Sequence, residues 1–113
     1  MKVEVVGTGE FEKWYLALDE KDTQAVDFIV EFLAARGVTL GYPYTSAIKG
    51  VGFALRELRA QFGGRPLRVL HAFDPKRRAV LLLGGDKSKD GFYDRTVPFC
   101  EKIWMRYLKE EGL

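Results

Sequence analysis

Large apolar side chains in the first third of the chain repeat at the spacing of a helix face. Phe11, Trp14, Tyr15 and Leu18 lie three or four positions apart, with acidic residues ahead of them. The same spacing continues in residues 22–36, where aspartates at positions 19 and 22 can cap a helix and a glycine at position 37 can end it. We therefore expect two consecutive helices that form a hairpin.

Four other segments are rich in β-branched and aliphatic residues and are bounded by glycine or proline, which is typical of strands. The turns FGGR and DPKRR join the last three of them, and turns this short force antiparallel pairing. The intervening GVTLGYPYTSAIKGVG predicts a loop. The predicted strands are residues 2–7, 53–61, 66–73 and 79–85.

A last helix is predicted near the C-terminus, capped by Thr96 and carrying Pro98 in its first turn. Its expected inward stripe is Phe99, Ile103, Tyr107 and Leu108. The element order is then β, α, α, β, β, β, α. This order predicts an α+β fold in which an N-terminal helix hairpin and a C-terminal helix pack on an antiparallel sheet.

Length and composition narrow the class of protein. The chain of 113 residues predicts one domain, residues 1–113, large enough to fold without disulfides, and Cys100 is its only cysteine. No apolar run reaches the roughly 18 residues of a membrane span, and no signal peptide pattern opens the chain. We expect a soluble cytoplasmic protein that does not bind a membrane.

Charge is divided unevenly along the chain, although the net charge is only +2. Residues 1–48 hold four basic and eight acidic side chains, whereas residues 49–95 hold eleven basic and five acidic ones. Six arginines lie in residues 56–78 alone. This distribution favours a basic face that binds nucleic acid, with solvated hairpin edges as the alternative.

Alternation along the predicted strands sorts the candidate residues by face. Glu57 and Arg59 share one face of their strand, and Arg56 lies on the other. Arg68 falls in mid-sheet among apolar residues, so an ion pair with Glu57 on the neighbouring strand is its favoured role. His71 is the only histidine, which makes a zinc site or a Cys/His nucleophile improbable and favours a partly buried imidazole.

The stretch GGDKSKDGFY, residues 84–93, follows the apolar run AVLLL, residues 79–83. One interpretation is a solvated turn, with Lys87 and Lys89 facing water and Phe92 and Tyr93 anchoring the next helix. The other is a lip that binds phosphate or a base, although the spacing is not that of a P-loop. The residues alone leave both interpretations open.

Taken together, several of these stretches resemble a known family. RELR (56–59), LRVLHAFDPKRRAVLLLGGDK (67–87), FY (92–93) and RYLKE (106–110) are similar to the HigB-like branch of the RelE/ParE toxin superfamily of type II toxin–antitoxin systems. The resemblance covers roughly residues 11–110. It implies a toxin that cuts mRNA on the ribosome without a metal or other cofactor, and so inhibits translation.

The resemblance also implies roles for individual residues. Arg68 matches an arginine that contacts the scissile phosphate, Lys87 a basic residue after the last strand, and Tyr93 a tyrosine that stacks on or protonates the RNA. Glu57 or Lys87 would then serve as the base. The resemblance and the basic stretch together give the expected RNA-binding residues Arg56, Arg59, Lys89 and Phe92.

Two departures leave other functions open. Leu55 and Glu57 stand where some RelE-type members have lysines, and SKDG (88–91) stands where some HigB members have histidines. A ParE-like inhibitor of DNA gyrase and a phage-derived RNA-binding protein without catalysis are therefore the alternatives. As a partner, the resemblance implies a small helix-turn-helix antitoxin in a toxin–antitoxin hetero-oligomer.

Overall fold

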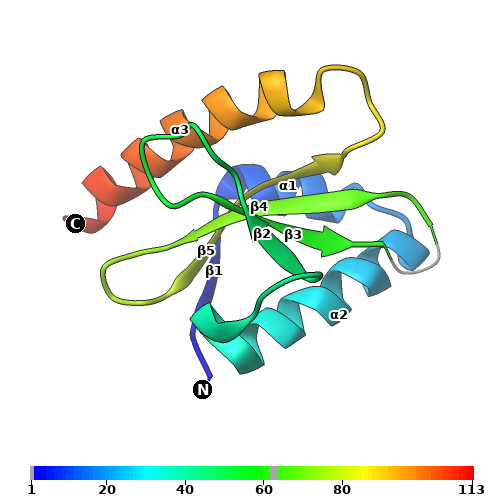
Figure 1. Cartoon of the computed structure of the whole chain (residues 1–113), viewed down its shortest axis with the longest axis horizontal. Coiled ribbons are helices and arrows are strands. Elements are labelled where there is room, and N and C mark those ends of the chain that lie inside the picture. Colours follow the sequence, from blue (N-terminus) through cyan, green and yellow to red (C-terminus); the bar gives the residue numbers. More distant parts are fainter. Residues whose placement is uncertain (1, 62–63) are drawn as a thin grey trace.

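The computed structural model describes residues 2–61 and 64–113 and has an α+β fold (Figure 1). In chain order the elements are β1 (Val5–Gly7), α1 (Gly9–Leu16), α2 (Glu20–Arg36), the 3-10 turn η1 (Gly37–Thr39), β2 (Thr45–Ala47), β3 (Arg56–Ala60), β4 (Leu67–Phe73), β5 (Ala79–Asp86) and α3 (Phe92–Glu111). The predicted order is confirmed, with η1 and β2 as additions inside the segment expected to be loop.

The five strands form one sheet in the order β1-β5-β4-β3-β2. Strands β3, β4 and β5 pair antiparallel, as their short turns predict, whereas β1 pairs with β5 in parallel. The sheet is therefore mixed, which corrects the prediction of a wholly antiparallel one. No short turn joins β1 to β5, because two helices and three strands lie between them in the chain, so their relative direction was not determined by turn length.

Helices cover both faces of this sheet. Helices α1 and α2 pack on one face over a core that includes Leu58, Val69 and Leu81, and α3 packs on the other over Leu70, Val80 and Leu82. Figure 1 shows α3 and α2 on opposite sides of the strands. None of the helices in residues 2–61 and 64–113 is long and apolar enough to cross a membrane.

The first two helices begin at side-chain caps. Thr8 Oγ1 accepts a hydrogen bond from the Phe11 backbone N–H at 3.1 Å, and Asp19 Oδ1 accepts one from the Asp22 N–H at 2.8 Å. Such caps satisfy N–H groups that have no partner within the helix. The aspartate cap confirms the prediction for α2, which ends at Gly37 as expected.

The start of α3 differs from the prediction. The helix begins at Phe92 after Gly91, whose φ of 69° suits glycine, and Thr96 is already buried inside it. The inward stripe is shifted accordingly: Ile103 and Tyr107 are buried as expected, but Phe99 is 46% exposed. Cys100 takes its place in the core, because successive helical residues lie about 100° apart around the axis.

Two consecutive glycines near the end of β5 each make room for an aromatic ring, one on each face of the sheet. A Cβ atom on Gly84 would lie 2.2 Å from the Trp14 ring of α1, and one on Gly85 would lie 2.5 Å from the Phe92 ring of α3. Both glycines lie in β5, in agreement with the predicted strand 79–85. Because they lack side chains, both helical layers can approach the strand.

The turn between β4 and β5 is fixed by one carboxylate. Asp74 Oδ1 accepts the backbone N–H groups of Lys76 and Arg78, each at 2.9 Å. Its Oδ2 accepts the Arg78 guanidinium and the Tyr107 hydroxyl of α3, each at 2.8 Å. The DPKRR turn is thus confirmed and held against α3, whereas the FGGR turn falls partly outside the described residues.

Candidate functional site

Three of the predicted site residues meet on the face of the sheet that α3 covers. Glu57 lies in β3, Arg68 in β4 and Tyr93 in the first turn of α3. The Tyr93 hydroxyl donates to Glu57 Oε1 at 2.5 Å, and Arg68 Nε lies 3.4 Å from the same oxygen. One carboxylate oxygen therefore joins the three side chains, which come from three separate elements.

Burial shows which of these side chains an RNA could reach. Arg68 is only 3% exposed, and its Nη1 donates to the Leu67 carbonyl at 3.0 Å. Glu57 and Tyr93 are partly exposed and lie closer to the surface. The ion pair predicted for Arg68 is thus present, and this arginine forms the floor of the site rather than its rim.

The environment of Tyr93 keeps its hydroxyl protonated. Burial raises the pKa of Tyr93 above its usual value, and the hydrogen bond to Glu57 raises it further. The nearby Arg68 opposes this shift. The hydroxyl therefore carries a proton at neutral pH and is oriented by Glu57. Both properties are required of a general acid.

Arg59 is the cross-strand partner of Arg68, so both lie on the same face of the sheet. Its Nη1 donates to the Pro43 carbonyl at 3.0 Å and its Nη2 to Ser46 Oγ at 2.8 Å. Its guanidinium carbon also lies 5.6 Å from the centre of the Tyr42 ring. Tyr42 and Ser46 were not among the predicted site residues, because the composition of residues 37–52 does not determine the path of that segment.

Lys87 and Lys89 lie in the exposed loop between β5 and α3, and they line an open hollow together with Tyr93. The loop is held at its start by Asp86, which accepts hydrogen bonds from the Ser88 backbone N–H at 2.9 Å and from the Ser88 hydroxyl at 2.6 Å. Both lysines therefore lie on the same side of the molecule as the Tyr93 side chain.

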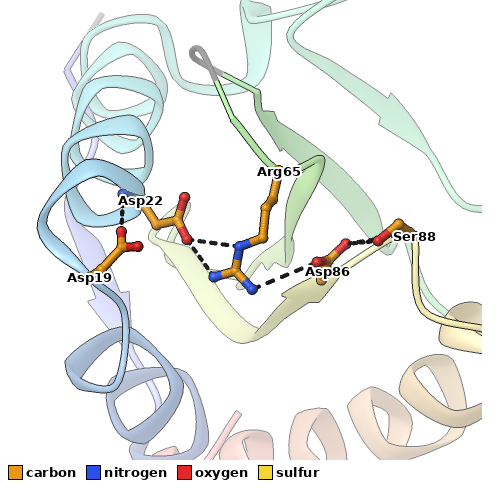
Figure 2. Close-up of polar contacts among 5 residues, drawn as sticks. All are labelled: Asp19, Asp22, Arg65, Asp86 and Ser88. Atoms are coloured by element: carbon orange, nitrogen blue, oxygen red, sulfur yellow. Dashed lines mark hydrogen bonds and ion pairs between the residues drawn. The ribbon is translucent and has the colours of Figure 1, made fainter.

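A network of charges ties this loop to α2, as Figure 2 shows. Arg65 donates to Asp22 at the start of α2, with Nε at 2.9 Å, and its Nη1 lies 3.7 Å from Asp86. These bonds connect the β3–β4 turn, α2 and the end of β5. This role of Arg65 was not predicted, because it depends on contacts between elements that are distant in the sequence.

Two residues predicted to bind RNA lie elsewhere. Arg56 is the cross-strand partner of His71 and shares the face of Leu58, so it lies on the side of α1 and α2. Phe92 is 5% exposed and packs in the core beneath α3, so it cannot stack on a base in this structure. Phe92 is the hydrophobic anchor that the sequence offered as the other interpretation.

Residues that could serve metal or nucleophilic chemistry are buried. His71 is fully buried, and burial lowers its pKa to about 4, helped by Arg56, so the ring is neutral. Burial raises the pKa of the Cys100 thiol to about 12. Over residues 2–61 and 64–113, no cluster of three or more histidine, cysteine or acidic side chains could hold a metal ion.

Comparison with known proteins assigns the chain to a family. The family model described as phage derived protein Gp49-like (DUF891) matches residues 13–104, which is most of the chain. The chain therefore belongs to the phage-derived Gp49-like family and groups with the HigB-like putative toxins. The resemblance noted in the sequence is thereby confirmed.

Two relatives from Mycobacterium tuberculosis carry the toxin assignment. The chain is 34% identical to putative toxin HigB3 over 105 residues, which is 90% of each chain. It is 30% identical to putative toxin HigB2 over 101 residues, which is 86% of this chain but only 50% of that protein. The chain is therefore comparable in extent with HigB3 and spans half the length of HigB2.

Solved structures share the fold at low sequence identity. A free double mutant of the Escherichia coli toxin RelE matches with a TM-score of 0.64 at 8% identity, over 87% of this chain and 97% of that one. The RelE of an archaeal RelE–RelB complex from Pyrococcus horikoshii matches with a TM-score of 0.57 at 18% identity, over 79% and 99%. The fold is that of RelE.

Proposed function

We propose that the protein is the toxin of a type II toxin–antitoxin system that cuts mRNA on the ribosome, without a metal, and thereby inhibits translation in the cytoplasm. The chain would act as one RelE/HigB-like domain, residues 1–113. One observation carries the proposal: Glu57, Arg68 and Tyr93 meet at a single carboxylate oxygen in a HigB-like fold. They comprise an acceptor of protons, a fixed positive charge and a donor of protons.

These three groups are suited to cleavage through the 2′-hydroxyl of RNA. Glu57 takes the proton of the 2′-hydroxyl, and the 2′ oxygen attacks phosphorus. The bond from phosphorus to the 5′ oxygen breaks, and Tyr93 gives its proton to that oxygen. The products are a 2′,3′-cyclic phosphate and a 5′-hydroxyl. The hydrogen bond between Tyr93 and Glu57 then returns the proton to the tyrosine, so both groups are restored.

Positive charge around the site stabilises the phosphorane. Arg68 does so from beneath, because it is buried against Glu57, and this position differs from the direct phosphate contact that the family resemblance implies. Lys87 and Lys89 are exposed at the mouth and can contact the RNA backbone directly. Arg59 extends the positive charge along the same face of the sheet, next to Arg68.

The partner we propose is a small helix-turn-helix antitoxin that forms a hetero-oligomer with the toxin. It would neutralise the toxin by covering the face of Arg59 and Lys87 or by displacing α3, which carries Tyr93. The archaeal RelE of the same fold was solved with RelB, which supports an antitoxin as the partner. Hydrogen exchange of α3 in the purified complex separates the two modes, since only displacement would speed exchange there.

Primer extension on mRNA, with and without ribosomes, tests the proposed activity. The wild type should cut mRNA in the presence of ribosomes, and Tyr93→Phe should lower the rate roughly a hundredfold or more, since it removes only the hydroxyl. Lys87→Ala should also lower the rate. Lys76→Ala is the control, because Lys76 is an exposed lysine in the β4–β5 turn, which contacts the C-terminal end of α3 through Arg78 and Glu111.

Primer extension, together with assays of growth and of DNA gyrase, also tests the alternative functions. A toxin that arrests growth with intact mRNA while DNA gyrase stalls would be a ParE-like inhibitor, and the proposal would be wrong. Full activity of Tyr93→Phe would exclude this residue as the acid and leave its ring as the functional part. Binding of RNA without cleavage by the wild type would indicate a protein that has lost catalysis.

A further inference from the structure

A second part of the same sheet face has the features of a site for an unpaired base. The Tyr42 side chain is 83% exposed, more than any other large apolar or aromatic side chain in the described residues. The Arg59 guanidinium lies over its ring at 5.6 Å, within the range of a cation–π contact. One face of the ring is thus occupied by an arginine, while most of the ring remains open to water.

The arginine is not a mobile surface side chain. Both of its terminal nitrogens donate hydrogen bonds, to the Pro43 carbonyl and to the Ser46 hydroxyl. These bonds hold the guanidinium plane and, with it, the segment that carries Tyr42. A ring held in this way loses little conformational freedom when a second flat group stacks on it.

This pair of side chains lies beside the proposed catalytic site. Arg59 is directly opposite Arg68 in the sheet, and Ser46 is directly opposite Glu57. Opposed residues share a face and have Cα atoms about 5 Å apart. An RNA strand whose phosphate lies at Glu57 and Tyr93 therefore has a neighbouring nucleotide within reach of Tyr42.

We propose that Tyr42, held by Arg59, is a stacking platform for an unpaired base of the substrate RNA next to the scissile phosphate. The proposal rests on the proposed function for its substrate, and it adds a binding residue outside the catalytic group. Aromatic rings backed by arginine suit single-stranded RNA, because every base has a face that can stack. An RNA duplex, with its bases already stacked, would not use the platform.

Binding of a short single-stranded RNA to the purified protein tests the proposal. The probe is a fluorescein-labelled RNA in which a 2′-O-methyl group replaces each 2′-hydroxyl, so that binding is measured without cleavage, and a series of the same oligomer lacks one base at a time. Tyr42→Ala should weaken binding about five- to 150-fold, the usual effect of losing one stacked base. Tyr42→Phe and Tyr42→Trp should bind as the wild type does.

The oligomers that lack one base make the test specific. At one position, loss of the base should weaken binding to the wild type and have little effect on binding to Tyr42→Ala, because the ring and the base act as a pair. Phe99→Ala is the matched control, since it removes another exposed ring, on α3 beside Trp14 and Leu83. It should leave the affinity unchanged, and thermal melting should show each variant folded.

Three results would overturn the inference. The first is equal binding by Tyr42→Ala and the wild type, and the second is equal binding of the complete oligomer and of every oligomer that lacks one base. The third is that removal of a base weakens binding to Tyr42→Ala as much as it weakens binding to the wild type. A loss of affinity for the antitoxin alone would assign Tyr42 to the partner instead. If the wild type cuts mRNA but Tyr42→Ala binds RNA equally well, the platform is rejected and the ribonuclease activity stands. If Tyr42→Ala binds RNA more weakly but the wild type cuts no mRNA, the platform stands and the ribonuclease activity is rejected.

Discussion

Replacing Arg68 by methionine should lower stability strongly, because the arginine neutralises a largely buried carboxylate. Arg68 Nε lies 3.4 Å from Glu57 Oε1, and the side chains are 4% and 13% exposed. At an effective dielectric constant of about 20, two unit charges at this distance attract each other by about 5 kcal/mol. Removal of one partner from a buried pair costs about 3–5 kcal/mol, since the other charge is left uncompensated.

The expected change is large enough to measure by thermal melting. A domain of this length unfolds with an entropy near 0.24 kcal/mol per degree, so 1 kcal/mol corresponds to about 4 °C. Arg68→Met should therefore melt roughly 13–21 °C below the wild type. Glu57→Gln should also be destabilised, and the double variant should lose much less than the sum of both, because neither charge is then left alone.

Arg106→Met is the matched control for this prediction. Arg106 also pairs with a glutamate, Glu10, but its side chain is 45% exposed. Surface pairs contribute about 0–1 kcal/mol, so the control should melt within about 4 °C of the wild type. If the melting temperature of Arg68→Met is as close to the wild type as that of the control, and the variant cuts no mRNA, the reasoning is refuted. Arg68 would then contact the phosphate directly.

Three further predictions concern the core, the β4–β5 turn and the buried thiol. Gly84→Ala should cost about 1–3 kcal/mol on thermal melting, because its Cβ would strike the Trp14 ring, whereas Gly9→Ala, with open space around it, should change little. Burial alone would raise the pKa of the Asp74 carboxyl, but hydrogen bonds from the turn and α3 outweigh it and lower the pKa. Asp74 should therefore add stability above about pH 4 and lose that contribution at lower pH. Denaturant unfolding should show that Asp74→Asn loses less free energy of unfolding, relative to the wild type, at about pH 3 than at about pH 7. Cys100 should react with iodoacetamide slowly in the native protein and much faster in urea; equal rates would contradict its burial.

Local patterns in the sequence predicted the elements whose causes are local. The helix cap at Asp19, the stop at Gly37 and the antiparallel pairing of β3, β4 and β5 depend on residues close in the chain. The parallel pairing of β1 with β5 depends on a contact between distant segments. Strand β2 has three residues, too few for an alternation to be visible, so it was hidden in a loop.

The site was predictable to the extent that strand alternation fixes it. Alternation indicated that Glu57 and Arg68 could pair, and the ion pair is present. The same rule set Arg56 on the opposite face, where it is found. Two contacts were out of reach: the Tyr93 bond to Glu57 depends on where α3 begins, and the Arg59 contact with Tyr42 depends on the path of a loop.

The pairing of β1 with β5 also sets an order of events during synthesis. Thr8 Oγ1, next to β1, donates to the carbonyl of Leu82, 74 positions later in the chain. Proteins emerge from the ribosome from the N-terminus onward, so the first strand must wait until β5 has been made before its edge of the sheet can close. Tyr93 follows later still. A nascent chain of this protein therefore cannot bring Glu57, Arg68 and Tyr93 together before residue 93 has been made.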